Sequence, residues 1–387
     1  MSERNSSEPT ARGQVFFPLV IHREEAQPQE EVRALWVTRW DYSSPEDVGT
    51  IAERAAAAHF NTIFFQVRGN ADAYYDSGFE PWAQRLSGTL GQDPGCDPLA
   101  LAVEEAHRRG LELHAYVNVY TAWVGSEPPQ LVSPEPMFHQ FNRLYGETWV
   151  QWHEDGSPMS LNPSYLWASP GHWAVAEHVL CVAQDIVSRY EVDGLHLDYV
   201  RYAGPAYSHD PVSTARFAKE QVLNPSLTWA DWQRARVSEL VGRLHAKVCT
   251  LRPGMLLSAA VWPVYRDRWD WWTTADGYDG YYQDSLGWLQ AGRIDAICPM
   301  LYGSTLLHYE ERFEALLQDF VALAAGRPIY AGISAGYENF SPVARRIELA
   351  RSLGAQGQAI FSCRLIEQRG FWDDFRQGPY ARPAHGR

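Results

Sequence analysis

The chain has 387 residues and a formal net charge of −14, and 45% of its residues are hydrophobic. This composition excludes a disordered chain, and the acidic balance without a basic stripe excludes nucleic acid or an anionic membrane surface as the expected partner. No apolar run is long enough to span a bilayer, so no integral membrane segment is expected. The 16 Trp residues are unusual, because indoles both fill cores and stack on flat ligand faces.

Residues 1–30 are polar and are expected to form an extended N-terminal segment. They lack a charged region followed by an apolar core, so no export signal is visible and a cytoplasmic location stays open. From residue 31 onward, strand-like and helix-like patterns alternate. Predicted strands cover 32–38, 61–67, 111–117, 192–202, 255–262, 295–301, 328–333 and 357–363. Predicted helices cover 45–58 (with Ser44 as N-cap), 97–109, 172–190, 229–250, 285–291, 308–325 and 342–353.

Eight strands alternating with helices over residues 31–370 predict an α/β fold, a (β/α)8 TIM barrel. No glycine-rich phosphate loop follows the first strand, which disfavours a dinucleotide-binding fold. Residues 118–169 and 203–227 are much longer than ordinary connections, so long βα-loop insertions are expected. Residues 371–387 contain Pro, Gly and Arg and are expected to form a C-terminal tail.

The fourth predicted strand carries the densest group of reactive side chains. Because side chains alternate along a strand, Leu195 and Leu197 point to one face and His196 and Asp198 to the other. If the leucines pack under the outer helices, His196 and Asp198 face the barrel interior. Asp198 then lies nearest the C-terminal mouth, where barrel enzymes have their active sites.

The same alternation predicts a ring of inward-facing polar and aromatic side chains at the mouth. A buried polar group without a partner costs about 1–3 kcal/mol, so such a ring is expected where its members satisfy one another or a ligand. A role as an internally satisfied core residue stays open for each histidine. The candidate substrate-binding residues are Trp36, Gln66, Arg68, Asp72, His114, Tyr116, Asn118, His196, Arg201, Tyr202, Trp262 and Tyr302.

Carboxylates for acid, base or nucleophilic chemistry, polar groups for hydroxyls and aromatic rings for stacking together indicate glycosidic bond cleavage. His196, Asp198 and His114 also raise the possibility of a metal site. No HxxH or HExxH motif and no third clustered ligand accompanies them, so neither a metal nor another cofactor is expected.

Several segments form a recognisable set. They include Phe65-Gln66-Val67-Arg68, Glu80-Pro81-Trp82, Asp97-Pro98-Leu99, Asp193-Gly194-Leu195-His196-Leu197-Asp198-Tyr199 and Pro299-Met300-Leu301-Tyr302. Over about residues 32–365 the chain resembles the glycosyl-hydrolase-like 10 family. That resemblance implies a TIM-barrel glycosidase whose bacterial relatives act on peptidoglycan glycan strands and are commonly exported. Three positions depart from the family pattern: Val119 stands in place of Pro, Thr121 in place of Arg, and Met300 in place of Gln.

The fourth strand also resembles the chitinase signature, in which the catalytic acid lies two residues beyond the last Asp. Here that position is Val200, so substrate-assisted cleavage of the chitinase kind is not expected. In amylase-like barrels the carboxylate at the end of strand four is the nucleophile, and Asp198 occupies the comparable place.

The leading hypothesis is therefore a glycoside hydrolase of bacterial polysaccharide with Asp198 as its main carboxylate. Asp284 and Glu338 are the catalytic candidates for its partner acid, with Asp72 and Glu80 also on mouth loops; Asp284 is equally readable as a helix N-cap. Arg201 is expected to pair with Asp198 or with a lactyl carboxylate of muramic acid. The alternatives are a non-catalytic carbohydrate-binding barrel and a metal-dependent polysaccharide deacetylase. The oligomeric state is not predicted.

Overall fold

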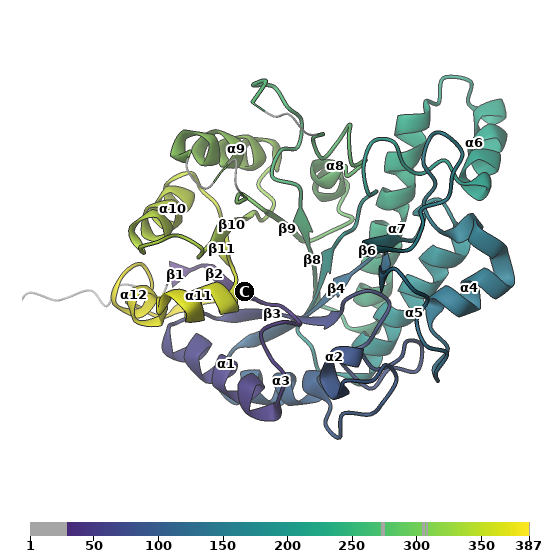
Figure 1. Ribbon diagram of the computed structural model, residues 1–387. Helices are drawn as coiled ribbons and strands as arrows, with labels where there is room; N and C mark the ends of the chain where they lie inside the picture. The colour runs from purple at the N-terminus through teal and green to yellow at the C-terminus, as the bar shows by residue number, and fades with distance from the viewer. Residues whose placement is uncertain (1–28, 272–274, 304–305, 307–308, 387) are drawn as a thin grey trace, which may run out of the picture.

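The computed structural model describes residues 29–271, 275–303, 306 and 309–386; the first 28 residues of the expected N-terminal segment lie outside this range. At the centre is a parallel eight-stranded sheet in the order β10-β11-β2-β3-β4-β7-β8-β9. A parallel bridge from Ile297 to Ile329 connects the two outer strands, so the sheet is a nearly closed barrel surrounded by helices (Figure 1). The predicted (β/α)8 TIM barrel is confirmed.

The barrel elements follow the predicted alternation. The strands are β2 (Val32–Val37), β3 (Thr62–Arg68), β4 (Glu112–Asn118), β7 (Gly194–Asp198), β8 (Leu256–Val261), β9 (Ala296–Pro299), β10 (Tyr330–Ser334) and β11 (Gly357–Phe361). The helices are α1 (Pro45–Ala57), α2 (Gln84–Ser87), α3 (Pro98–His107), α4 (Met137–Tyr145), α5 (Trp173–Arg189), α6 (Pro211–Leu223), α7 (Trp229–Leu251), α8 (Ser285–Gln290), α9 (Glu310–Leu323), α10 (Ser341–Ser352), α11 (Cys363–Arg369) and α12 (Trp372–Gln377).

Local sequence explains where the helices begin. Ser44 caps α1 as predicted: its hydroxyl accepts a hydrogen bond from the Asp47 amide, and the Asp47 carboxylate accepts one from the Ser44 amide. Asp97 caps α3 in the same way, with Pro98 at the first helical position. Such caps satisfy amide groups that the helix itself leaves without acceptors.

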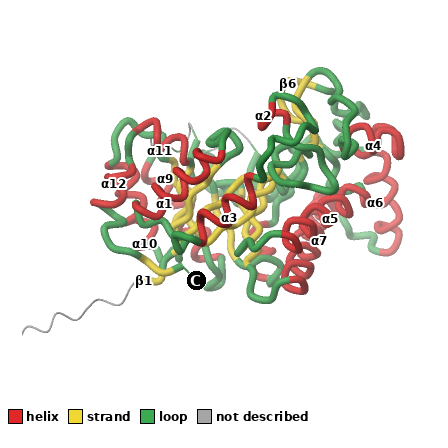
Figure 2. The backbone as a smooth tube through the Cα atoms, turned by 90° about the horizontal axis from the view of Figure 1, so that it is seen from below, coloured by secondary structure: helices red, strands yellow, loops and turns green. Residues whose placement is uncertain are grey.

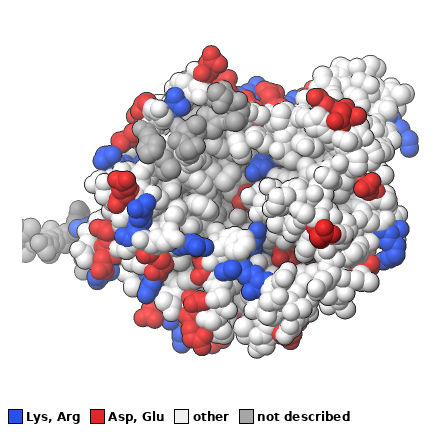
Figure 3. Space-filling model, viewed as in Figure 1, with Lys and Arg blue, Asp and Glu red and all other residues white. Residues whose placement is uncertain are grey.

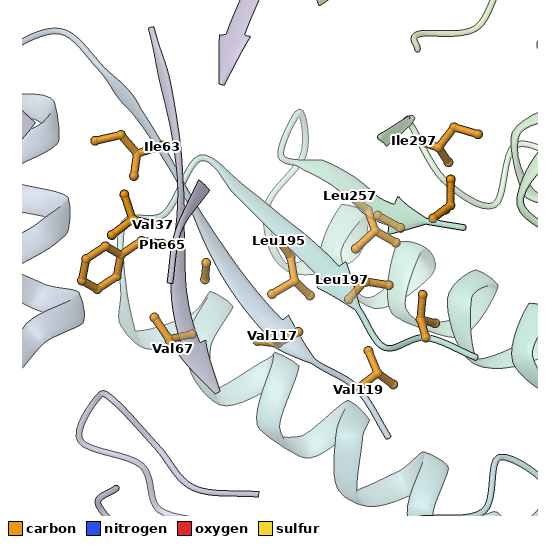
Figure 4. Close-up of a cluster of buried hydrophobic side chains, with 14 of the residues drawn as sticks. Val37, Ile63, Phe65, Val67, Val117, Val119, Leu195, Leu197, Leu257 and Ile297 are labelled. Carbon is orange, nitrogen blue, oxygen red and sulfur yellow. The ribbon is translucent and has the colours of Figure 1, made fainter. Parts of the chain in front are cut away.

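Alternate residues of the barrel strands build two separate cores. Outward-facing side chains such as Phe65, Leu195 and Leu197 pack beneath the surrounding helices (Figure 4). The inward-facing set is smaller and includes Trp36 and Phe64. Each fully buried Leu or Phe stabilises the fold by about 1.5–3 kcal/mol, so the outer layer fixes which residues face the barrel axis.

The long connections contain secondary structure of their own. Residues 118–169 form the antiparallel pair β5 (Thr121–Gly125) and β6 (Asn162–Trp167) together with α4, and the connection after β7 contains α6. Asp210 joins the two insertions, because its buried carboxylate accepts hydrogen bonds from Ser169 at 2.7 Å, Ser208 at 2.8 Å and Ser213 at 2.6 Å. The expected βα-loop insertions are therefore present and held to each other.

The C-terminal segment, which was expected as a tail, packs against the barrel. Phe375 and Tyr380 are fully buried, and both rings lie near Phe60, with centroids 5.2 and 5.3 Å away. β12 (Ala384–His385) pairs in parallel with β1 (Gln29–Glu30), which brings the two ends of the described chain together (Figure 2). The aromatic positions decide this packing, although the Pro, Gly and Arg content had favoured a tail. None of the described helices has both the length and the apolar character that crossing a bilayer requires.

Candidate active site

Asp198 ends β7 at the C-terminal mouth of the barrel, in the position that strand alternation predicts. Its register partner on the neighbouring strand β4 is Asn118. Tyr116, two residues earlier on β4, is the register partner of His196. Asp198 Oδ2 accepts a hydrogen bond from Tyr116 Oη at 2.8 Å, and Oδ1 accepts one from the Tyr199 amide at 2.6 Å. Burial raises the pKa of Asp198, while the Arg201 charge and the two hydrogen bonds oppose that rise. The site thus holds a carboxyl group that takes up a proton more readily than an exposed Asp.

The backbone turns sharply after this carboxylate. Tyr199 has a φ of 51°, in the left-handed region that residues with a Cβ rarely adopt. This conformation lets the Tyr199 amide reach back to Asp198, while the Val119 amide donates to the Asp198 carbonyl at 2.8 Å. Strained backbone of this kind concentrates at functional sites, where it fixes a reactive side chain.

Arg201 lies in an aromatic enclosure beside the carboxylate. Its Cζ is 4.9 Å from the ring centroid of Tyr199, and 5.2–5.3 Å from those of Trp167, Trp262 and Tyr281. These rings hold a cation through their electron-rich faces but accept no strong hydrogen bond. Arg201 is 8% exposed, and no described residue accepts a hydrogen bond from its guanidinium. Its planar set of N–H donors is therefore available to a ligand.

Tyr302 lies on the other side of the mouth, after β9. Its ring stacks on Phe361 at 5.0 Å and meets Trp36 edge-on at 6.1 Å. Burial raises the pKa of Tyr302 well above its ordinary value, and the nearby Asp198 charge adds to the rise. The Tyr302 hydroxyl is therefore neutral, and it makes no hydrogen bond within the part of the chain that the structure describes.

His196, predicted to bind substrate, has both ring nitrogens occupied. Trp36 Nε1 donates to His196 Nε2 at 3.0 Å, and His196 Nδ1 lies 2.9 Å from Ser258 Oγ. An indole N–H only donates, so Nε2 accepts and the proton of the neutral ring is on Nδ1. The ring also stacks on Phe64 at 4.0 Å, and burial holds its pKa well below the ordinary value. His196 and Trp36 therefore brace the barrel interior beneath Asp198, and the predicted sugar contact does not fit this geometry.

His114 lies deeper still. It pairs with Gly194 at the start of β7, where a Cβ atom would come within 2.4 Å of His114 Nδ1. The side chain is 2% exposed, and neither of its ring nitrogens has a hydrogen-bond partner among the described residues. Gly194 lies at the opposite end of β7 from Asp198, so His114 is distant from the mouth.

Gln66 and Asn118 are at the mouth, but they bind each other. Gln66 Nε2 donates to Asn118 Oδ1 at 3.2 Å, and Gln66 Oε1 accepts from the Arg39 amide at 2.9 Å. Asn118 Nδ2 donates to the Gly69 carbonyl at 3.0 Å. The two amides thus fix the loops after β2 and β3, which is a positioning role rather than a free binding surface.

Arg68, the remaining predicted contact on β3, faces away from the axis. A bulge after Gln66 pairs Arg68 with Val117, whose side chain belongs to the outer core. The Arg68 guanidinium makes a bidentate ion pair with Glu80, and Glu80 Oε1 also lies 2.8 Å from His178 Nε2. Burial alone would raise the pKa of Glu80, but Arg68 and His178 lower it to about 2. Arg68 therefore holds the loop after β3 and does not face the mouth.

Asp72 lies on the same loop as Glu80, but the pKa of its carboxyl group is shifted in the opposite direction. It is 7% exposed, and its Oδ1 accepts the Asn70 amide at 2.8 Å. Burial raises the pKa of Asp72, and Arg39 is the largest opposing influence. Arg39 in turn donates to Tyr165 Oη at 3.0 Å. Tyr165 lies edge-on to Tyr199 at 5.1 Å, so a chain of contacts connects the loop of Asp72 to Asp198.

The two predicted acid partners do not join this group. Asp284 caps α8 by accepting the Gly287 amide at 3.1 Å, and it accepts the Tyr265 hydroxyl at 2.7 Å. Glu338 is exposed to solvent in the loop between β10 and α10. Asp284 therefore has the N-cap role that the sequence left open, and neither carboxyl is desolvated as Asp72 and Asp198 are.

Of two further predicted substrate contacts, Tyr202 after β7 is turned away from the mouth and Trp262 after β8 lies at the mouth. Tyr202 is fully buried in the outer core, edge-on to Tyr282 at 5.2 Å, and its hydroxyl has no partner among the described residues. Trp262 stays at the mouth, with its ring 4.2 Å from that of Tyr281. Sequence reasoning missed the enclosure residues Trp167, Tyr199 and Tyr281 and the connecting residues Arg39 and Tyr165. The alternation Tyr199-x-Arg201 was the only local sequence pattern that indicated the aromatic enclosure.

The geometry agrees with the comparisons to known proteins. The glycosyl hydrolase-like 10 family model matches residues 31–338. The chain belongs to this family. It is 26% identical to the glycosyl hydrolase YngK of Bacillus subtilis over 93% of this chain and 74% of that protein. It is 28% identical to the glycosyl hydrolase DigH of Escherichia coli over 62% of this chain, and spans about half (54%) of that protein.

Solved structures agree on the fold. The PgaB (BpsB) glycoside hydrolase domain of Bordetella bronchiseptica superposes with a TM-score of 0.66 at 14% identity, over 89% of this chain and 98% of that one. The catalytic domain of a Paenibacillus polymyxa β-amylase gives a TM-score of 0.62 at 10% identity, over the same shares. At these identities the likeness establishes the barrel alone. Membership of the glycosyl hydrolase-like 10 family supports a glycosidase.

The hydrogen bond from Tyr116 gives a first testable prediction for this family member. A Tyr116→Phe variant removes a donor that stabilises ionised Asp198, so the pKa of Asp198 rises further. We expect the acidic limb of the kcat/KM profile to move to higher pH, with roughly a tenfold loss of kcat/KM. Tyr302→Phe is the matched control, because its hydroxyl makes no hydrogen bond to Asp198 and the limb should stay in place. An unmoved limb in Tyr116→Phe would contradict this assignment.

Proposed function

We propose that this chain hydrolyses glycosidic bonds in peptidoglycan glycan strands, with Asp198 as the carboxylate that acts on the sugar. The observation that carries the proposal is that a buried carboxyl group, Asp198, and the positive charge of Arg201 act on each other at the barrel mouth. A buried carboxyl there meets the requirement of glycosidic chemistry. A guanidinium without an acceptor among the described residues meets the requirement of an anionic glycan.

Arg201 supplies the argument for the substrate. Muramic acid carries a lactyl carboxylate on every second sugar of peptidoglycan, whereas chitin and cellulose carry none. Arg donors in a planar fork match a carboxylate in a bidentate arrangement. The aromatic rings around Arg201 hold it in place without using its donors, so binding a carboxylate costs little side-chain ordering.

The aromatic side chains of the enclosure support a saccharide in a second way. Trp262 and Tyr281 form a contiguous aromatic surface next to Arg201. Apolar ring faces of this kind pack against the C–H faces of sugars, while neighbouring polar groups bind their hydroxyls. Tyr302, whose hydroxyl has no partner among the described residues, is such a polar group on the other side of the mouth.

Asp72 is the second carboxyl of the proposed mechanism. Glu80 is kept ionised by its ion pair, which lowers its pKa to about 2. Asp284 caps α8, and Glu338 is exposed to solvent in the loop between β10 and α10. Asp72 is buried, with its pKa raised by burial, and is connected to the mouth through Arg39. A carboxyl protonated at higher pH than usual is suited to protonate a leaving oxygen.

The test compares glycan strands freed of peptide in two forms, one with intact lactyl carboxylates and one in which they have been amidated. We expect wild type to release reducing ends from the intact strands at least tenfold more efficiently, measured as kcat/KM. Arg201→Met should remove most of that difference, because the preference for intact strands comes from the contact between the Arg201 charge and the lactyl carboxylate. Equal activity on both forms would overturn the muramic acid assignment. Binding without any release of reducing ends would overturn the hydrolase and favour the carbohydrate-binding alternative.

The described residues gather no group of three His, Cys, Asp or Glu side chains suited to holding a metal ion. The proposed reaction depends on the carboxyl groups of Asp198 and Asp72. Activity that a chelator abolishes would instead favour the deacetylase alternative.

A further inference from the structure

We propose that Trp40 forms a distal subsite that stacks on a sugar ring of the same anionic strand, beyond the ring that is cleaved at Asp198. This inference rests on the proposed function and extends it along the substrate. Trp40 follows β2 at the mouth side of the barrel and is 52% exposed. Trp36, within β2, is buried, whereas Trp40 lies in the turn after the strand and is open to solvent.

The exposed indole is held in place. The guanidinium Cζ of Arg85 lies 4.8 Å from its ring centroid and that of Arg39 lies 5.0 Å away. Arg85 also donates to the Arg39 carbonyl at 2.7 Å and to the Trp40 carbonyl at 3.3 Å. A ring that is already ordered loses little entropy when a ligand stacks on it. Half of its surface nevertheless remains in contact with solvent.

A cavity of about 440 Å³ opens beside Trp40, between α1 and α11. This volume is in the range of small-molecule sites. Its wall combines apolar side chains (Trp40, Ile51 and Cys363) with polar ones, which suits a sugar that presents hydroxyls around an apolar face. The polar side chains that line it include Asp41, Asp47, Arg54, Arg364 and Glu367.

The charge around the subsite fits an anionic strand. Arg39 and Arg85 lie against the Trp40 indole, whereas the cavity wall carries both signs: Arg54 and Arg364 are accompanied by Asp41, Asp47 and Glu367. The positive charge available to a strand is therefore at the indole itself. Figure 3 shows Lys and Arg side chains in a row across this face, between the positions of α11 and α2 in Figure 1. A lactyl carboxylate near this row gains favourable charge interactions that a neutral glycan lacks.

The subsite is continuous with the proposed active site. Arg39, the residue before Trp40, donates to Tyr165 Oη at 3.0 Å, and Tyr165 contacts Tyr199 beside Asp198. These contacts fix Trp40 relative to the cleavage point, and a strand that reaches both would pass over the loops that carry Arg39 and Tyr165. The subsite should be occupied only by substrates long enough to reach it.

The experiment measures kcat and KM of wild type, Trp40→Ala and Trp40→Phe on peptide-free glycan strands sorted by length. On long strands we expect Trp40→Ala to raise KM about tenfold, the usual value of one aromatic stacking contact, and Trp40→Phe to recover most of the loss. On tetrasaccharides the three enzymes should be equal. Trp173→Ala is the matched control, because Trp173 is 54% exposed on α5 and should leave KM unchanged for both lengths.

The outcomes separate this inference from the proposed function. Wild type without activity on any muramic glycan would overturn the proposed function. Wild-type activity with an unchanged KM in Trp40→Ala would overturn the distal subsite alone. An equal loss on short and long strands would also overturn it, since that pattern indicates a structural effect, and thermal unfolding of the variant would register the same effect independently.

Discussion

An Asp198→Asn variant is expected to release reducing ends from peptide-free glycan strands roughly 10²–10⁴-fold more slowly than wild type. The change removes the negative charge that acts on the sugar but keeps the size of the side chain. The amide oxygen can still accept the Tyr199 amide, so the loss should appear in kcat with the thermal unfolding midpoint nearly unchanged. Kinetics and a melting curve on the same preparation check both parts.

Asp193→Asn is the matched control, because it is the other carboxyl of the same motif. Asp193 accepts hydrogen bonds from the Leu113 amide and His107 at the opposite end of the barrel, each at 2.8 Å. Its replacement should lower stability slightly and leave kcat unchanged. Full activity of Asp198→Asn would remove Asp198 from the chemistry.

The same assay distinguishes the role of Asp72. Asp72→Asn should reduce activity on glycan strands, where the leaving sugar needs a proton. On an aryl glycoside with a good leaving group, which needs no protonation, its activity should be close to that of wild type. An equal loss on both substrates would assign Asp72 to binding or structure instead.

A Glu80→Gln variant is expected to lose about 3–5 kcal/mol of stability, the usual cost of breaking a buried ion pair on one side. The Glu80 side chain is fully buried against Arg68 and His178, and its replacement leaves the Arg68 charge without its carboxylate partner. The loop after β3 also carries Asp72, so activity should fall together with stability. Urea unfolding measures the first effect and strand hydrolysis the second.

Two comparisons test whether the buried ion pair is the cause of the stability loss in Glu80→Gln. Glu367→Gln, which breaks the partly exposed pair with Arg54, should cost less than about 1 kcal/mol. The folded pKa of Glu80 is about 2, below its unfolded value, so its contribution to stability is present above the unfolded pKa and is lost as pH falls toward 2. Glu80→Gln should lose part of the acid sensitivity of wild type. A cost equal to that of Glu367→Gln would show that the pair contributes little.

The pattern of the sequence was sufficient for the barrel and for Asp198. Alternation along a strand follows from the local hydrogen-bond ladder, so Leu195 and Leu197 pointing to the helices force Asp198 toward the axis. The cap at Ser44 is also a local property, because it needs only the next three residues. The family motifs lie on these same elements, which is why the sequence predicted the fold, the family and the position of Asp198 together.

Only the tertiary structure decided which of the inward-facing and mouth residues are free to bind. A bulge after Gln66 places the Arg68 side chain in the outer layer. The indole N–H of Trp36 donates to the acceptor nitrogen of His196, which is then not available to a ligand. The charge of Arg39 acts on Asp72, while its guanidinium donates to Tyr165 near the mouth, far away in sequence. These outcomes depend on which side chains meet across strands and loops, which alternation along one strand does not encode. The sequence by itself thus determined the barrel and the place of its carboxylate, while packing between distant segments decided its neighbours.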